Sequence, residues 1–341
     1  MTVATHELAA LIERARRHEP GAVSQLVSVF EDQRPDAIRT RAEVIAQLDA
    51  APRRPAVVIG ITGTPGSGKS TLVSRLTERL TQVDDTLTLA VVAVDPSSHV
   101  SGGALLGDRT RMRPRGTDAR VFFRSQASAT ELGGLGPSSF QVCRLLARLY
   151  DLVLVETVGI GQSEIDVRHL ADRVELVLQP LGGDEIQFLK AGIIEVPDGF
   201  VLNKVDQPQA VDSERHLRAS LWLARPFDAD EVPIHRTSAL TGEGIDELVA
   251  AFRRVVAAGP AAGVGGAGGA GGALDDRAPH FLARWVEEEW GRVGRRFLDD
   301  QLGGATRYLA DAGGYDQAQL GFSDRLRAAE HLPPSTRQEP R

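Results

Sequence analysis

The chain has very little cysteine and lysine, and it contains no long apolar run. Its single cysteine, Cys143, excludes a disulfide within the chain, and its helical spacing from Leu146 predicts a buried structural thiol rather than a nucleophile or ligand. No run reaches the roughly eighteen apolar residues that a membrane-spanning helix needs. The first residues, MTVATHELAALIERARR, carry charges where a secretory signal would require an apolar stretch. We therefore expect a cytoplasmic protein with no membrane partner.

The charge balance argues against nucleic acid as a partner. The 341 residues include 39 basic and 46 acidic side chains, which gives a formal net charge of −7. No local run of basic residues is present, so the chain has no general electrostatic attraction for nucleic acid or anionic lipid. We expect no nucleic-acid partner, and the hydrophobic fraction of 42% allows a substantial core.

Among the 39 basic residues only Lys69, Lys190 and Lys204 are lysines. A composition with this bias toward arginine tends to spare lysines that arginine cannot replace. Two of the three lie in the nucleotide motifs described below, whereas no pattern assigns a role to Lys190.

The apolar pattern divides the chain into four segments. Residues 1–54 carry helical patterns throughout and form an N-terminal extension. Over residues 55–258, short apolar runs such as AVVIGI, TLTLAVVAV, LVLV and GFVLN alternate with helical patterns. That alternation predicts an α/β domain with a mainly parallel sheet flanked by helices. Residues 259–273 form a Gly/Ala-rich linker, and residues 274–341 form a helical C-terminal arm and tail.

Two of the predicted helices carry clear apolar stripes. The last helix of the α/β domain has the stripe Ile245, Leu248, Val249, Phe252, Val255 and Val256. The arm has the stripe Phe281, Leu282, Trp285, Val293 and Phe297. A Gly-rich linker of this length spans roughly 20–25 Å as a flexible coil. The arm must therefore bury its aromatic residues either on its own domain or on another subunit.

The stretch VVIGITGTPGSGKST satisfies the phosphate-loop pattern GxxxxGK[ST] between a predicted strand and a predicted helix. Glycines let successive backbone N–H groups curl around phosphate groups, and the helix start adds its positive end. We expect the Lys69 ammonium to reach the terminal phosphates and the Ser70 hydroxyl to bind magnesium. The expected nucleotide contacts are Gly63, Thr64, Pro65, Gly66, Ser67, Gly68, Lys69, Ser70 and Thr71.

Three carboxylates are candidates for the metal ion and the third phosphate. Asp95 ends the run TLTLAVVAVD, at the strand edge where the ligands of doubly wound sheets collect, and Asp108 lies in the glycine-rich segment GGALLGDRTRM. An ordinary turn at Asp95 and a solvated Asp108 paired with neighbouring arginines are the alternatives. Glu156 opens an ExxG loop, where it binds magnesium through water or contacts the attacking water, and the N–H of Gly159 senses the third phosphate.

The stretch GFVLNKVDQP identifies the base. Its Asn203, Lys204 and Asp206 fit the NKxD pattern, in which the aspartate accepts two hydrogen bonds from guanine and the lysine lies along the base. Two charge-assisted bonds contribute about 3–6 kcal/mol, which favours GTP over ATP. After a further strand, Ser238, Ala239 and Leu240 resemble the loop that supports guanine in GTPases.

Taken in order, GITGTPGSGKSTL, VAVDPSS, SGGALLGDRTRM, ETVGIGQSE, GGDEIQFLKAGIIE and NKVD resemble the MeaB/ArgK family of P-loop GTPases, over roughly residues 1–258. Members of this family are chaperones of adenosylcobalamin-dependent acyl-CoA mutases such as methylmalonyl-CoA mutase. The resemblance implies that Lys69, Asp95, Asp108 and Glu156 surround magnesium and the γ-phosphate. It also implies that Gln162 lies in the switch facing the mutase, and that the C-terminal arm joins a homodimer.

The function expected from this resemblance is GTP hydrolysis, to GDP and phosphate, that gates cofactor loading and protects or reactivates the mutase. Two alternatives stay open. A metallochaperone GTPase would need a Cys or His cluster, and the chain has one cysteine and eight scattered histidines. A protein kinase acting on a transport-related binding protein would share the phosphate loop, but no acceptor site is identifiable.

Overall fold

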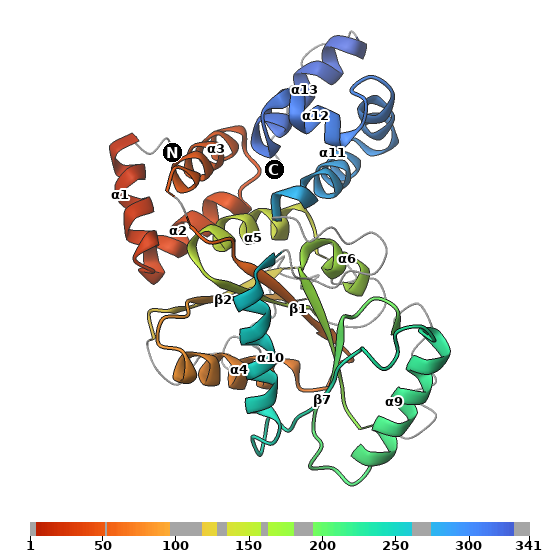
Figure 1. The fold of residues 1–341 in the computed structure, drawn as a ribbon. Helices are drawn as coiled ribbons and strands as arrows, with labels where there is room; N and C mark the ends of the chain where they lie inside the picture. The colour runs from red at the N-terminus through yellow and green to blue at the C-terminus, as the bar shows by residue number, and fades with distance from the viewer. Residues whose placement is uncertain are drawn as a thin grey trace, which may run out of the picture.

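Seven parallel strands form one sheet in the order β3-β2-β4-β1-β5-β6-β7 (Figure 1). This computed structural model describes residues 5–51, 53–95, 118–127, 135–157, 163–180, 194–260 and 274–330. The strands are β1 Val57–Gly63, β2 Leu89–Asp95, β3 Val121–Ala127, β4 Leu152–Thr157, β5 Arg173–Leu178, β6 Gly199–Leu202 and β7 Ile234–Arg236. The helices of this domain are α4 Lys69–Val83, α5 Pro137–Leu149, α6 Ser163–Leu170, α9 Ala210–Ala224 and α10 Ile245–Ala258.

Helices cover both faces of the sheet, so the central strands are buried on both sides. Alternate residues of β1, beginning with Val57, pack toward α4 and α10, whereas Val58 packs toward α5 and α6. Two-sided burial explains why these strands appear as continuous apolar runs. The predicted α/β class is confirmed, and so is the α10 stripe, whose first four members are buried while Val255 and Val256 pack at its edge.

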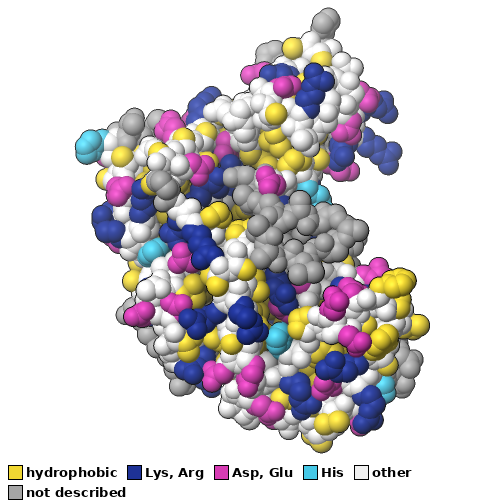
Figure 2. All heavy atoms as spheres, in the orientation of Figure 1, with side chains coloured by type: hydrophobic (Ala, Val, Ile, Leu, Met, Phe, Trp, Pro, Cys, Tyr) yellow, Lys and Arg dark blue, Asp and Glu magenta, His cyan; other side chains and the backbone are white. Residues whose placement is uncertain are grey.

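The outer half of the sheet is covered by α9, which buries Leu217 and Leu221 against β5 and β6. Near its C-terminal end the helix leaves Trp222 and Leu223 exposed, and Phe227 in the turn that follows is exposed as well. Hydrophobic side chains gather at the outer edge of the molecule beside the C-terminal end of α9 (Figure 2). On the face shown there, basic and acidic side chains are interspersed.

Cys143 lies in the core between α5 and the sheet. Burial raises the pKa of its thiol to about 12, so the group stays protonated at neutral pH and the prediction of a structural thiol is confirmed. None of the helices in the described ranges has the length and apolar character to span a membrane.

The N-terminal and C-terminal helices lie side by side at one end of the molecule (Figure 1). The N-terminal helices are α1 Thr5–Arg16, α2 Pro20–Glu31 and α3 Pro35–Asp49. The arm comprises the 3-10 turn η2 Leu274–Arg277 and the helices α11 Ala278–Asp300, α12 Ala305–Ala312 and α13 Tyr315–Glu330. Because α13 packs against α3 and α11 packs against α5, the arm rests on its own chain. Residues 261–273 of the predicted linker lie outside the described residues.

The arm buries its aromatic side chains within this chain. Phe281 stacks on Phe140 of α5 with ring centroids 4.5 Å apart, and Trp285 lies in the same core. The long helix of the arm is not continuous, because Gly291 adopts φ 58° and ψ −146° and changes the helical phase. Val293, which belongs to the predicted stripe, is therefore 56% exposed.

A buried polar network fastens the arm to the rest of the molecule. Asp316 of α13 lies 3.3 Å from Nε of Arg41 in α3 and accepts a 3.0 Å hydrogen bond from Nη1 of Arg144 in α5. Arg41 also donates to Gln319 at 2.8 Å, and Arg144 donates to Gln141 at 2.7 Å. All five side chains are buried, so each depends on the others to compensate for lost hydration.

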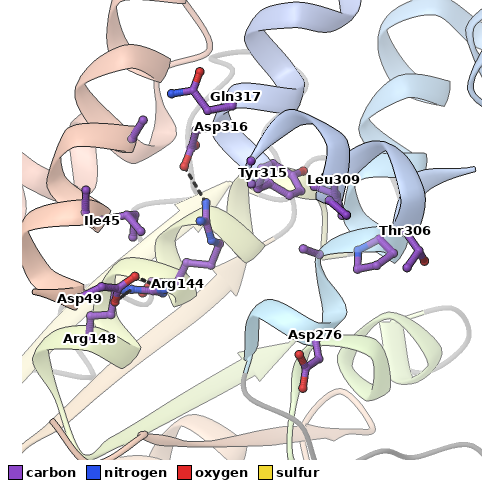
Figure 3. Close-up of a pocket in the computed structure, with 17 residues that line it drawn as sticks. Ile45, Asp49, Arg144, Arg148, Asp276, Thr306, Leu309, Tyr315, Asp316 and Gln317 are labelled. Carbon is purple, nitrogen blue, oxygen red and sulfur yellow. Dashed lines mark hydrogen bonds and ion pairs between the residues drawn. The ribbon is translucent and has the colours of Figure 1, made fainter. Parts of the chain in front are cut away.

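Beside this network, a hollow of about 710 Å³ opens between α3, α5 and the arm (Figure 3). Ile45 and Leu309 contribute to its apolar wall. Four of its charged side chains are paired with one another, because Nη1 of Arg144 donates to Asp316 and Nε of Arg148 donates to Asp49 at 2.7 Å. No residue of the predicted nucleotide motifs lines this hollow.

A second set of contacts joins the arm to α6. Nη1 of Arg284 in α11 donates to Asp166 of α6 at 2.7 Å, and Arg277 donates to the last carbonyl of α6 at 2.6 Å. The rings of His169 and His280 stack with centroids 3.7 Å apart. Burial and the neighbouring cations lower the pKa of His280 to about 4, so this stacked ring is neutral at pH 7.

Replacing Asp316 by alanine should destabilise the protein strongly. The change leaves the Arg41 and Arg144 guanidinium groups buried without their carboxylate, which costs about 3–5 kcal/mol of unfolding free energy. Asp311→Ala is the matched control, because its exposed partner Arg307 lies 3.7 Å away and such pairs contribute about 0–1 kcal/mol. Urea unfolding of both variants measures the difference, and equal losses would contradict the role assigned to the network.

Candidate functional site

The loops that carry the predicted motifs meet at one edge of the sheet. The phosphate loop follows β1, Glu156 lies near the carboxyl end of β4, and the loop with Asn203 follows β6. In the sheet, β5 separates β1 from β6, so the two loops approach each other across the end of β5. Parallel strands place all their carboxyl ends on the same side, which is where ligands of such sheets bind.

Two glycines of the phosphate loop are required by close contacts with neighbouring residues. At Gly63, φ is 148° and an added Cβ atom would lie 2.0 Å from the carbonyl oxygen of Val177 in β5. At Gly68, φ is 87° and a Cβ atom would lie 2.7 Å from Nδ2 of Asn203. Any other residue at these two positions would push the loop away from its neighbours.

The phosphate loop has the features of an anion site. Nζ of Lys69 lies inside the loop and donates to the carbonyl oxygens of Gly63 and Thr64 at 2.9 and 3.0 Å. No side chain caps the start of α4, so its first N–H groups point at the loop. The hydroxyl oxygens of Thr64 and Ser67 are buried and have no hydrogen-bond partner among the described residues. Hydroxyls, an ammonium and helix N–H groups together suit a chain of phosphates.

A hydroxyl and a carboxylate meet directly beside this loop. Oγ of Ser70 donates to Oε1 of Glu156 at 2.6 Å, and the Glu156 side chain is buried. Both groups are oxygen ligands of the kind that magnesium prefers, so the residues present fit the ion. In the neighbouring strand β2, Ala93 is paired with Glu156, which places the backbone of Asp95 at the same edge.

Several predicted site residues cannot be placed. The side chain of Asp95 and the whole of Asp108, Gly159 and Gln162 lie outside the described residues. Lys190, to which no role was assigned, is outside them as well.

Asn203 connects the two halves of the predicted nucleotide site. Its Nδ2 atom donates to the carbonyl oxygen of Ser67 at 2.8 Å. Its Oδ1 atom accepts hydrogen bonds from the Ala239 N–H at 3.1 Å and the Thr237 hydroxyl at 3.3 Å. The side chain is 1% exposed, so the amide works as an internal strut between the phosphate loop and the loop after β7.

The other predicted base-binding residues lie in the loops after β6 and β7, beside Asn203. Nζ of Lys204 donates to the carbonyl oxygen of Gly66 at 2.6 Å, so this side chain reaches back over the phosphate loop. Asp206 is exposed, as its expected hydrogen bonds to a base would require. In the supporting loop, Ser238 is buried and accepts from the Thr241 N–H at 3.1 Å, while Leu240 is 78% exposed.

Gln179 is a site residue that no sequence pattern indicated. It directly follows β5, between the phosphate loop and the base loop, and its Oε1 atom accepts a 2.7 Å hydrogen bond from Nζ of Lys204. The signal that would have found it is its place immediately after an apolar run, where polar residues of parallel sheets meet ligands.

Asn203→Ala should weaken nucleotide binding and stability together. It removes three hydrogen bonds in a buried position, at about 1–3 kcal/mol for the polar groups left unsatisfied. Gln207→Ala is a suitable control, since Gln207 is exposed in the same loop. GDP titration calorimetry and thermal unfolding measure the two effects; binding by Asn203→Ala as tight as by the control would show that the strut is dispensable.

The comparisons with known proteins agree with this geometry. A family model described as "Methylmalonyl Co-A mutase-associated GTPase MeaB" matches residues 23–268. A protein of Pyrococcus horikoshii named as a GTPase is 39% identical over 242 residues, which cover 70% of this chain and 74% of that protein. GTPase ArgK of Escherichia coli is 37% identical over 250 residues, covering 71% of this chain and 73% of the relative.

Two further similarities extend the comparison. The mitochondrial methylmalonic aciduria type A homolog of mouse is 40% identical over 195 residues, which cover 56% of this chain and 46% of the mouse protein. The crystal structure of a LAO/AO transport system kinase superposes with a TM-score of 0.64 at 23% identity, covering 97% of this chain and all of that one, and so shares its fold. With a family model matching most of its length, this chain belongs to the MeaB family of methylmalonyl-CoA mutase-associated GTPases and is a GTP hydrolase.

Proposed function

We propose that this GTPase acts as a chaperone of an adenosylcobalamin-dependent acyl-CoA mutase such as methylmalonyl-CoA mutase. In this role, GTP binding and hydrolysis gate cofactor loading and protect or reactivate the mutase. The observation that carries the proposal is the joining of Lys69, Ser70, Glu156 and Asn203 at one sheet edge, in a family named for its association with that mutase.

On the nucleotide side, Asp206 would read the guanine edge while Lys204 lies along the base. Lys69 and the N–H groups at the start of α4 would hold the phosphates. The loop that begins at Glu156 would respond to the third phosphate through Gly159, and Gln162 would face the mutase.

Magnesium is part of the proposal. Ser70 and Glu156 would hold the ion, together with Asp95 and Asp108. When bound, the ion neutralises charge that develops on the phosphate oxygens during hydrolysis. The chain's own contribution is to place the Ser70 hydroxyl and the Glu156 carboxylate 2.6 Å apart beside the phosphate loop.

The contacts of α6 favour a path from nucleotide to partner. This helix begins at Ser163, six residues after β4 ends at Thr157, and the arm holds it through Arg284 and Arg277. A nucleotide-dependent movement between β4 and α6 would therefore reach the arm, through which we also propose that a homodimer forms.

Lys69→Ala should abolish GTP hydrolysis, because the ammonium inside the phosphate loop is lost. Release of inorganic phosphate from GTP measures this, with ATP as the control nucleotide. Arg79→Ala is the control variant, since Arg79 lies on the exposed side of the same helix and pairs with Asp246. Normal turnover by Lys69→Ala would refute the site assignment, and phosphate transferred to protein instead of water would favour a kinase.

Adding the adenosylcobalamin-dependent mutase of the same organism should accelerate GTP turnover, because the sequence motifs assign no arginine finger and a partner would complete transition-state stabilisation. ATP turnover should stay absent with or without the mutase. GTP turnover that is indifferent to the mutase would leave the GTPase in place and remove this client.

A further inference from the structure

The ammonium group of Lys204 is held by two acceptors, one in the phosphate loop and one directly after β5. Nζ donates to the carbonyl oxygen of Gly66 at 2.6 Å and to Oε1 of Gln179 at 2.7 Å. Both distances are typical of charge-assisted hydrogen bonds. Gln179 is partly buried and directly follows β5, so the sheet fixes the position of its backbone.

The backbone of Lys204 supports the same interpretation. Its φ of 62° lies in the left-handed region, which non-glycine residues rarely adopt and which costs free energy. This conformation turns the side chain back over the phosphate loop, where Cε lies 3.7 Å from the position of a Cβ atom on Gly68. The left-handed backbone conformation and the two hydrogen bonds therefore both restrict the position of the Lys204 side chain.

We propose that Gln179 is a positioning residue for guanine nucleotides, which acts by fixing Lys204. With its ammonium shared between Gln179 and Gly66, the aliphatic part of Lys204 is held against the phosphate loop, where Cε lies 3.7 Å from the position of a Cβ atom on Gly68. A lysine that is already ordered loses less conformational entropy when a base packs against it. The inference rests on the proposed nucleotide site and adds a residue to it.

The strand order explains why this position is suited to the task. Because β5 lies between β1 and β6, the residue after β5 faces the loops that follow both neighbours. Gln179 therefore lies at the strand end between the two loops and contacts the base loop through Lys204. Its effect should fall on affinity for any guanine nucleotide, whereas Asp206 decides which base is accepted.

Gln179→Met tests the proposal, since methionine has a similar length but lacks the strong acceptor. Release of a fluorescent GDP analogue, followed by stopped flow, should be about 5–10-fold faster than in the wild type, as expected for the net contribution of one intramolecular hydrogen bond when the second acceptor, Gly66, is kept. The KM for GTP should rise while kcat at saturation is unchanged. Gln179→Glu keeps an acceptor and should restore slow release, and Gln209→Met, at an exposed site before α9, is the matched control.

A double-mutant cycle with Lys204→Ala separates this role from a structural one. If Gln179 acts through Lys204, Gln179→Met should cause no further acceleration in the Lys204→Ala background, and the melting temperature of the nucleotide-free protein should match that of the control. Equal acceleration in both backgrounds, or none in either, would overturn the proposal for Gln179. Unchanged GDP release in Lys204→Ala alone would instead overturn the assignment of the base site.

Discussion

The hydrogen bonds of the Asn203 amide hold the nucleotide site together. One amide joins the phosphate loop after β1 to the loops after β6 and β7, at Ser67 on one side and Thr237 and Ala239 on the other. The contact is possible only because β5 alone separates β1 from β6. The predicted phosphate and base loops are therefore joined by one side chain, and the close approach of Gly68 to Asn203 follows from the same constraint.

Two sets of contacts join the C-terminal arm to the rest of the molecule. The network of Arg41, Arg144 and Asp316 ties the N-terminal extension, the sheet domain and the arm into one body. The contacts of Arg284 and His280 attach the arm to α6, the helix closest in sequence to the Glu156 loop. In the proposed function, a movement driven by the third phosphate would reach the C-terminal helices through α6.

Local patterns were enough to predict the sheet, the phosphate loop and the NKxD segment, because each depends on residues adjacent in sequence. Contacts between distant segments were beyond that reasoning. Nothing near Arg41 indicates Asp316 as its partner, and nothing near Gln179 indicates Lys204. The helical break at Gly291 was missed because an isolated glycine is often tolerated within a helix. Whether Asp95, Asp108, Gly159 and Gln162 join the site stays a prediction.

Asp206 is expected to read guanine beside a phosphate loop organised by Lys69 and Asn203. The most direct test compares the affinities of Asp206→Asn and the wild type for GDP and xanthosine diphosphate by titration calorimetry. An asparagine amide can donate to the oxygen that xanthine carries in place of the guanine amino group, so the variant should lose GDP affinity and prefer the xanthine nucleotide. An unchanged preference for GDP would contradict the account.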